Sequence, residues 1–159
     1  MNIKLICIGK LKEQYLKDAC SEYIKRISRF AHTEICELSE YKLPENPSPA
    51  QTDKAISEES SAILRAADKA DYVIALDVKG KELSSPGLAE HIREKTVSGV
   101  STLAFIIGGS NGYDDSVRRR ADLVLSFSHL TFPHQLFRVM LLEQIYRVFK
   151  INAGEKYHK

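Results

Sequence analysis

Two short segments of the sequence combine residue types that suit ligand binding. Gly108 to Gly112 reads GGSNG and follows an apolar run, and glycines let a ligand approach the backbone closely. Phe127 to Phe132 reads FSHLTF, which is apolar for a connection, because most loops lie in water and are rich in Gly, Asn, Asp and Ser. We therefore expect this loop to bury its side chains against the protein or against a ligand.

A third segment, Leu76 to Gly80 (LDVKG), also follows an apolar run. If the three preceding strands run parallel, all three loops gather at the edge of the sheet where open α/β proteins bind ligands. Glycines beside apolar walls suit a nucleoside-like ligand held by backbone groups. A phosphate-rich nucleotide fits less well, since neither GxxxxGK(S/T) nor GxGxxG occurs. A tight turn without a ligand is the alternative interpretation of GGSNG.

The elements that must hold these loops alternate along the chain, which predicts an α/β fold: a mostly parallel sheet with helices on both faces. Residues 1–159 are expected to form one domain. Apolar runs predict strands at 3–8, 33–38, 72–76, 102–107 and 123–125. Amphipathic or capped segments predict helices at 10–30, 53–67, 84–97, 114–121 and 133–152. An irregular proline-containing connector is expected at 41–52, and a turn at 79–81.

The composition of the chain restricts the cellular compartment and the binding partners that we predict. The three cysteines are odd in number and form no CxxC pair, which argues against a disulfide framework or a zinc site and favours a reducing compartment. No signal peptide or membrane-spanning segment is evident, so we predict a cytoplasmic protein without membrane or metal partners. The net charge of +2 is too small to indicate nucleic-acid binding by itself.

The last predicted helix, which Pro133 opens, has an unusual polarity pattern. Glu143, Arg147 and Lys150 form one narrow polar stripe, and apolar residues cover most of the remaining surface. A surface helix needs an apolar stripe of only about 100° to face one core. The helix must therefore be enclosed within one subunit or buried between two. Its position at the end of a modest chain favours the second arrangement, a symmetric homodimer.

Taken together, the ordered motifs carry a resemblance to a known family. The chain resembles the SPOUT-class (trefoil-knotted) methyltransferases, and among them the ribosomal large-subunit methyltransferase H family, which methylates a pseudouridine of 23S rRNA. The resemblance covers essentially the whole length. It depends on the ordered set GKLK at 9–12, IIGGSNG at 106–112, LSFS at 125–128, TFPH at 131–134 and GEKYHK at 154–159.

This resemblance implies a carboxyl-terminal trefoil knot, in which the last segment threads through an earlier loop, an exception to the rule that chains avoid knots. It also implies S-adenosyl-L-methionine as the cofactor and methylation of ring nitrogen 3 of a pseudouridine in 23S rRNA, with the assembled ribosome as the target. The positions implied to bind the cofactor are Leu76, Gly108, Phe127, Ser128, His129, Leu130, Thr131 and Phe132.

The acceptor nitrogen carries a proton that must be removed for methyl transfer. A general base could accept this proton, or nearby groups could stabilise the developing anion. His158 and Tyr157 are the first candidates, because a short polar tail after a dimer helix could reach the partner's pocket. Arg138 could neutralise charge on the base or bind a phosphate. RNA contacts would come from local positive charge, for which the candidates are Arg118-Arg119-Arg120, Lys10, Lys12, Arg138, Lys156 and Lys159.

Two other functions are compatible with parts of this pattern. One is a nucleotide-binding enzyme of doubly wound topology, against which the missing phosphate motifs argue. The other is a non-catalytic, ribosome-associated binding module, in which the apolar loop packs as core. Cofactor titration separates all three.

Overall fold

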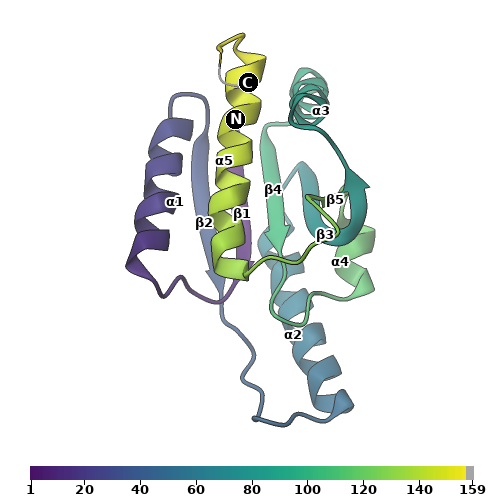
Figure 1. The fold of residues 1–159 in the computed structure, drawn as a ribbon. Helices are drawn as coiled ribbons and strands as arrows, with labels where there is room; N and C mark the ends of the chain where they lie inside the picture. The colour runs from purple at the N-terminus through teal and green to yellow at the C-terminus, as the bar shows by residue number, and fades with distance from the viewer. Residues whose placement is uncertain (157–159) are drawn as a thin grey trace.

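The computed structural model describes residues 1–156, and its centre is a five-stranded sheet in which every paired strand runs parallel (Figure 1). The strand order is β2-β1-β4-β3-β5. The strands are β1 (Asn2–Ile8), β2 (His32–Leu38), β3 (Tyr72–Glu82), β4 (Thr102–Ile107) and β5 (Leu123–Ser126). The predicted parallel sheet is confirmed.

Helices cover both faces of the sheet, as predicted, and each face has its own apolar core. One core packs the sheet against α1 (Gln14–Ile27), α3 (Ser85–Val97) and α5 (His134–Asn152). The other packs it against α2 (Pro49–Ala67) and α4 (Asp115–Arg120). Central strands of a doubly covered parallel sheet are apolar on both faces, which explains why Leu103 to Ile107 are all buried.

Two helix starts differ from the prediction. Helix α2 begins at Pro49 rather than at residue 53, because Ser48 and Gln51 form a capping box and proline fits the first helical turn. Helix α1 begins at Gln14 rather than at residue 10. The Leu11 and Lys12 N–H groups donate to the side chains of Glu37 and Gln135, which hold this segment outside the helix.

Strand β3 is the largest departure from the prediction. The expected turn at 79–81 is wrong, because β3 continues to Glu82 and its last part curls around β5 (Figure 1). Leu125 pairs first with Leu76 and, across a register shift, again with Lys81. Between them the chain crosses β5 at Gly80, where an added Cβ would lie 2.7 Å from the Leu125 carbonyl carbon. Only glycine permits so close a crossing.

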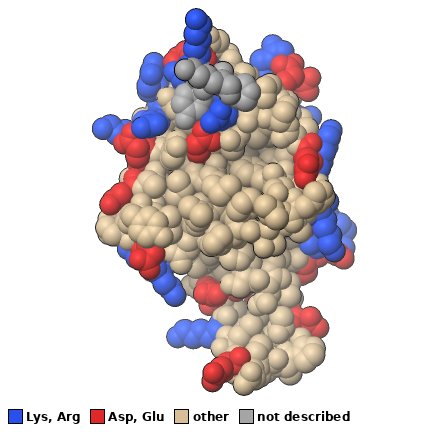
Figure 2. Space-filling view, viewed as in Figure 1, with Lys and Arg blue, Asp and Glu red and all other residues tan. Residues whose placement is uncertain are grey.

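Helix α5 lies on the sheet between α1 and α3, so much of its apolar surface is buried within one subunit. Against α1, the rings of Phe30 and Phe149 stack at 5.7 Å. The outward side still presents Leu136, which is 42% exposed. Figure 2 shows that the surface over α5 is mostly uncharged, hollowed and rimmed by charged side chains. Within residues 1–156, no helix is long and apolar enough to cross a membrane.

Candidate functional site

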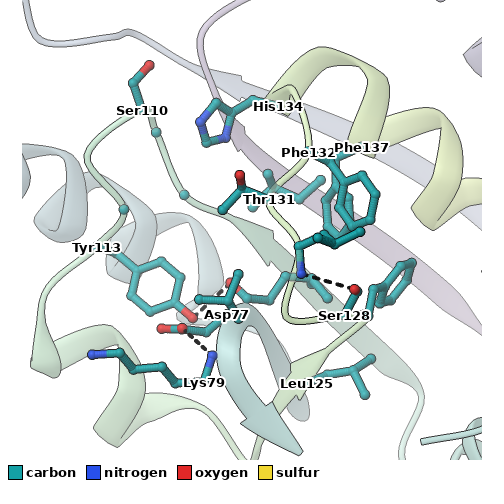
Figure 3. A pocket seen from close by; sticks show the side chains of 18 of the residues that line it. Asp77, Lys79, Ser110, Tyr113, Leu125, Ser128, Thr131, Phe132, His134 and Phe137 are labelled. Atoms are coloured by element: carbon teal, nitrogen blue, oxygen red, sulfur yellow. Dashed lines mark hydrogen bonds between the residues drawn. The ribbon is translucent and has the colours of Figure 1, made fainter. Parts of the chain in front are cut away.

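A cavity of about 650 Å³ lies at the carboxyl ends of β3, β4 and β5, where the three marked loops were expected to meet (Figure 3). All but one of the predicted cofactor positions line it: Leu76, Gly108, Phe127, Ser128, Leu130, Thr131 and Phe132. The exception is His129, whose side chain is 91% exposed and lies 3.5 Å from Glu82. The parallel sheet therefore brings together segments that are about fifty residues apart in the sequence.

The apolar wall of this cavity is an aromatic cluster shared by the loop after β5 and by α5. The ring of Phe137 lies 4.9 Å from that of Phe127 and 5.8 Å from that of Phe132, with the second pair stacked. The Ser128 hydroxyl accepts a hydrogen bond from the Leu130 N–H, which tightens the loop. Leu130 is 69% exposed although it lines the cavity. The loop thus packs its partly buried Phe side chains against Phe137 and leaves an apolar surface for a flat ligand.

Tyr113 supports the glycine loop from inside the protein. Its hydroxyl donates a hydrogen bond to the Leu76 carbonyl oxygen at 3.0 Å, which joins the loop after β4 to β3. A Cβ on Gly108 would lie 2.9 Å from the Tyr113 ring, so Gly108 is needed for close packing. Burial raises the pKa of Tyr113 above its usual range and keeps the hydroxyl a neutral donor. Sequence analysis missed this residue, although it directly follows the GGSNG segment.

A second support lies below the same loop, on α2. Glu59 is only 7% exposed and accepts a hydrogen bond from the Tyr41 N–H, while its other oxygen lies 2.6 Å from the position of a Cβ on Gly109. The neighbouring Ser60 hydroxyl accepts from the Asp114 N–H. Burial raises the pKa of Glu59. Helix α2 therefore supports the glycine loop through Glu59, which lies against Gly109, and through Ser60, which binds the Asp114 N–H.

The charged edge of the cavity is an ion pair between Asp77 and Arg118, with an oxygen–nitrogen distance of 2.6 Å. The Arg118 guanidinium also lies over the Tyr113 ring, 5.1 Å from its centre. Burial alone would raise the pKa of Asp77, but hydrogen bonds from the Lys79 N–H and from Arg118 outweigh burial and hold it below its usual value. Asp77 is therefore ionised at neutral pH and ties this part of β3 to Arg118 on α4.

We expect Asp77→Asn to lower the free energy of unfolding at pH 7 by about 1 kcal/mol, a value that allows for the partial exposure of Arg118. A lowered folded-state pKa stabilises the protein above the unfolded value of about 3.9, and this contribution is lost as the pH falls through the folded value. Urea unfolding at several pH values should show the two proteins converging below about pH 4.

Asp115→Asn is the matched control for this prediction, because Asp115 pairs with the same Arg118 but its side chain is 77% exposed. We expect no measurable change in its unfolding midpoint. A difference between Asp77→Asn and wild type that stayed constant down to pH 3 would contradict the proposed role of the Asp77 carboxylate.

Arg138, predicted to contact the substrate, occupies a different environment. Its side chain is 1% exposed and forms an ion pair with Glu37 at 2.7 Å. It also donates to the carbonyl oxygens of Ile8 and Gly9. A buried guanidinium is stable only with such partners. In the structure Arg138 therefore ties α5 to the ends of β1 and β2. The other two predicted catalytic residues, Tyr157 and His158, lie outside the described residues.

The predicted RNA-binding arginines are only partly free. Arg118 pairs with Asp77 and Asp115, and Arg120 pairs with Asp122 and donates to the Ala70 carbonyl oxygen. Arg119 is exposed and forms no ion pair within the described chain. Among residues 1–156, no group of three or more His, Cys, Asp or Glu side chains could hold a metal ion.

Comparison with known proteins gives a consistent result. A family model described as "Predicted SPOUT methyltransferase" matches residues 1–158. Proteins named ribosomal RNA large subunit methyltransferase H from Leuconostoc citreum and Carboxydothermus hydrogenoformans are each 50% identical over 159 residues, covering 100% of both chains. A solved structure from Haemophilus influenzae, titled a "probable methylase family protein", matches 99% of this chain and 70% of its own with a TM-score of 0.59 at 12% identity, which supports the fold. This chain belongs to the SPOUT methyltransferase family.

Proposed function

We propose that this protein transfers a methyl group from S-adenosyl-L-methionine to ring nitrogen 3 of a pseudouridine in 23S rRNA. The observation that carries the proposal is the cavity of about 650 Å³ at the carboxyl ends of β3, β4 and β5, which contains nearly all the positions expected to hold the methyl donor. Family membership supports the reaction type, and the names of the full-length relatives support the RNA class. The assembled ribosome in the cytoplasm is the proposed target.

The residues of the cavity fit this cofactor. Apolar side chains from Leu76, Ile107 and Leu130 offer walls for an adenine ring, and the backbone of the loop from Phe127 to Phe132 offers hydrogen-bonding groups beside them. When bound, S-adenosyl-L-methionine supplies an activated methyl group on a sulfonium. The protein then has to hold the acceptor in line, which by itself lowers the barrier through orientation.

The acceptor nitrogen carries a proton at neutral pH, so a group that accepts it would accelerate the reaction. We propose His158 for this role, with Tyr157 beside it, reaching the cavity of the partner subunit. Arg138 is proposed as a positioning residue, because its buried contacts with Glu37 and Gly9 hold the start of α5 against the end of β1. In this arrangement α5 fixes the aromatic wall through Phe137.

A trefoil knot and a homodimer complete the proposal. The crossing of β3 over β5 at Gly80, followed by pairing of Lys81 with Leu125, supports a loop of the earlier chain around β5. Helix α5 then returns to lie between α1 and α3, which is compatible with threading through that loop. The uncharged outward surface over α5 supports pairing with a second copy of the chain (Figure 2).

Calorimetric titration of the purified protein with S-adenosyl-L-methionine, with NADH and ATP in parallel, tests the proposal. We expect saturable binding of the methyl donor alone, followed by methylation of ribosomes. Binding of NADH or ATP in its place would favour a nucleotide-binding enzyme. The absence of binding by all three would favour a non-catalytic binding module.

A further inference from the structure

A second cavity, of about 520 Å³, adjoins the cofactor cavity. The two share one wall, formed by Gly109 and Ser110 from the loop after β4 and by Pro133 and His134 at the start of α5. Figure 3 shows Ser110 and His134 at the same end of the cofactor cavity. Any molecule that occupies the second cavity therefore lies directly beside the methyl donor's proposed site.

The outer wall of this second cavity combines positive charge with an exposed aromatic ring. Lys10 and Lys12 line it, and neither forms an ion pair within residues 1–156. Tyr15 also lines it, and its side chain is 68% exposed, which is unusual for a large ring on a helix that packs against the core. We call this space the lysine cavity.

The segment that carries the lysines is held firmly although it has no regular structure. The Leu11 N–H donates to Glu37 at 3.0 Å, and the Lys12 N–H donates to Gln135 at 2.9 Å. Arg138 binds the carbonyl oxygen of Gly9 at 2.8 Å, where the chain adopts a positive φ of 80°. These contacts fix the backbone of the segment to β2 and α5, so the chain positions of Lys10 and Lys12 are set before a ligand arrives.

We propose that the lysine cavity is the subsite for the acceptor nucleotide of the RNA, with its base stacked on Tyr15 and its phosphate bound by Lys10 and Lys12. This inference rests on the proposed function and names the substrate site next to the methyl donor. RNA that is read in single-stranded form is bound by base stacking on aromatic side chains together with cationic phosphate contacts. The two features occur here within six residues of the chain.

Acidic side chains in the same cavity restrict what it can bind. Glu13 and Glu40 line it together with the two lysines, so it is not a uniformly cationic surface. Carboxylate oxygens accept hydrogen bonds from N–H groups, which nucleobases offer and phosphates lack. The mixed lining therefore suits a nucleotide whose base enters the cavity better than it suits an anion alone. At the shared wall, Ser110 and His134 are the polar side chains that line both cavities.

Three properties of each variant are measured. Co-sedimentation gives ribosome binding, methylation assays give kcat/KM on ribosomes, and calorimetry gives the affinity for S-adenosyl-L-methionine. Tyr15→Ala should lower kcat/KM by about tenfold to a hundredfold, whereas Tyr15→Phe, which keeps the ring, should retain most of it. The double variant Lys10→Ala/Lys12→Ala should weaken ribosome binding and reduce the slope of log(kcat/KM) against log[salt] by about one to two. Cofactor affinity should not change.

Lys17→Ala is the matched control, because Lys17 is exposed on α1 but does not line the cavity. If wild-type protein methylates ribosomes and the Tyr15 and double-lysine variants behave like Lys17→Ala, the subsite is wrong and the proposed function stands. If Tyr15→Ala dissociates the dimer in analytical ultracentrifugation and Tyr15→Phe does not, the cavity wall belongs to the subunit interface and the inference is overturned. If wild-type protein binds no S-adenosyl-L-methionine, the proposed function fails, and the inference fails with it.

Discussion

Replacing Gly80 with valine should destabilise the native fold more than an ordinary overpacked core substitution does. The position of a Cβ at Gly80 lies 2.7 Å from the carbonyl carbon of Leu125 and 2.8 Å from that of Val124. Overpacking a core usually costs about 1–3 kcal/mol, because flexible side chains give way. Here the obstacle is the backbone of β5, so we expect a larger loss that removes much of a typical stability of about 5–15 kcal/mol. Urea unfolding followed by circular dichroism measures it.

Gly99→Ala is the control for this substitution. Gly99 has a positive φ of 100° but no atom within 4 Å of an added Cβ. Its cost should therefore be the conformational term alone, about 1 kcal/mol. Comparing the two variants separates the cost of a clash with the β5 backbone from the cost of backbone strain. A Gly80→Val protein with the wild-type unfolding midpoint and normal cofactor binding would show that β3 does not pass over β5 as the structure places it.

Replacing His158 with alanine should reduce the rate of methylation by about a hundredfold to ten-thousandfold while leaving cofactor affinity unchanged, since a general base contributes a factor of this size. The measurement pairs single-turnover methylation of ribosomes with calorimetric titration of S-adenosyl-L-methionine. In wild-type protein the rate should rise with pH as the proposed base loses its proton. The alanine variant should lose this rise.

His32→Ala provides a matched histidine control, because His32 is exposed at the start of β2 and lines no part of the cofactor cavity. It should methylate at the wild-type rate with the same pH profile. Full activity in His158→Ala would eliminate the proposed base. A weaker affinity for the cofactor with an unchanged rate at saturation would assign His158 to cofactor binding.

Much of the fold was predictable because the physical signals are local. Buried parallel strands are short apolar runs, and the amphipathic period between them identifies helices. Helix α5 was expected from Pro133 to Asn152 and spans His134–Asn152, since proline marks the start of a helix. The position of the site was predictable for the same reason, because parallel strands end at one edge of a sheet.

The errors arose where a distant partner decides the local structure. The turn expected at 79–81 is a continuation of β3, because Lys81 and Glu82 pair with Leu125 and Ser126 more than forty residues later. Similarly, Lys12 is held outside α1 by Gln135, 123 residues away. Helical periodicity extends through such a segment regardless of whether another element captures its N–H groups.

Residue type and spacing by themselves determined the layered α/β fold, the edge of the sheet at which the cavity lies, and the apolar character of the loop from Phe127 to Phe132. Only the tertiary structure decided which side chains meet. It placed Arg118 against Asp77, and it buried Arg138 with Glu37, 101 residues away, although both arginines were candidates for contacts with RNA. Sequence periodicity indicates which face of a helix or strand is buried. Ion pairs and chain crossings depend instead on how two elements are aligned relative to each other, and the sequence of either element alone does not determine that alignment.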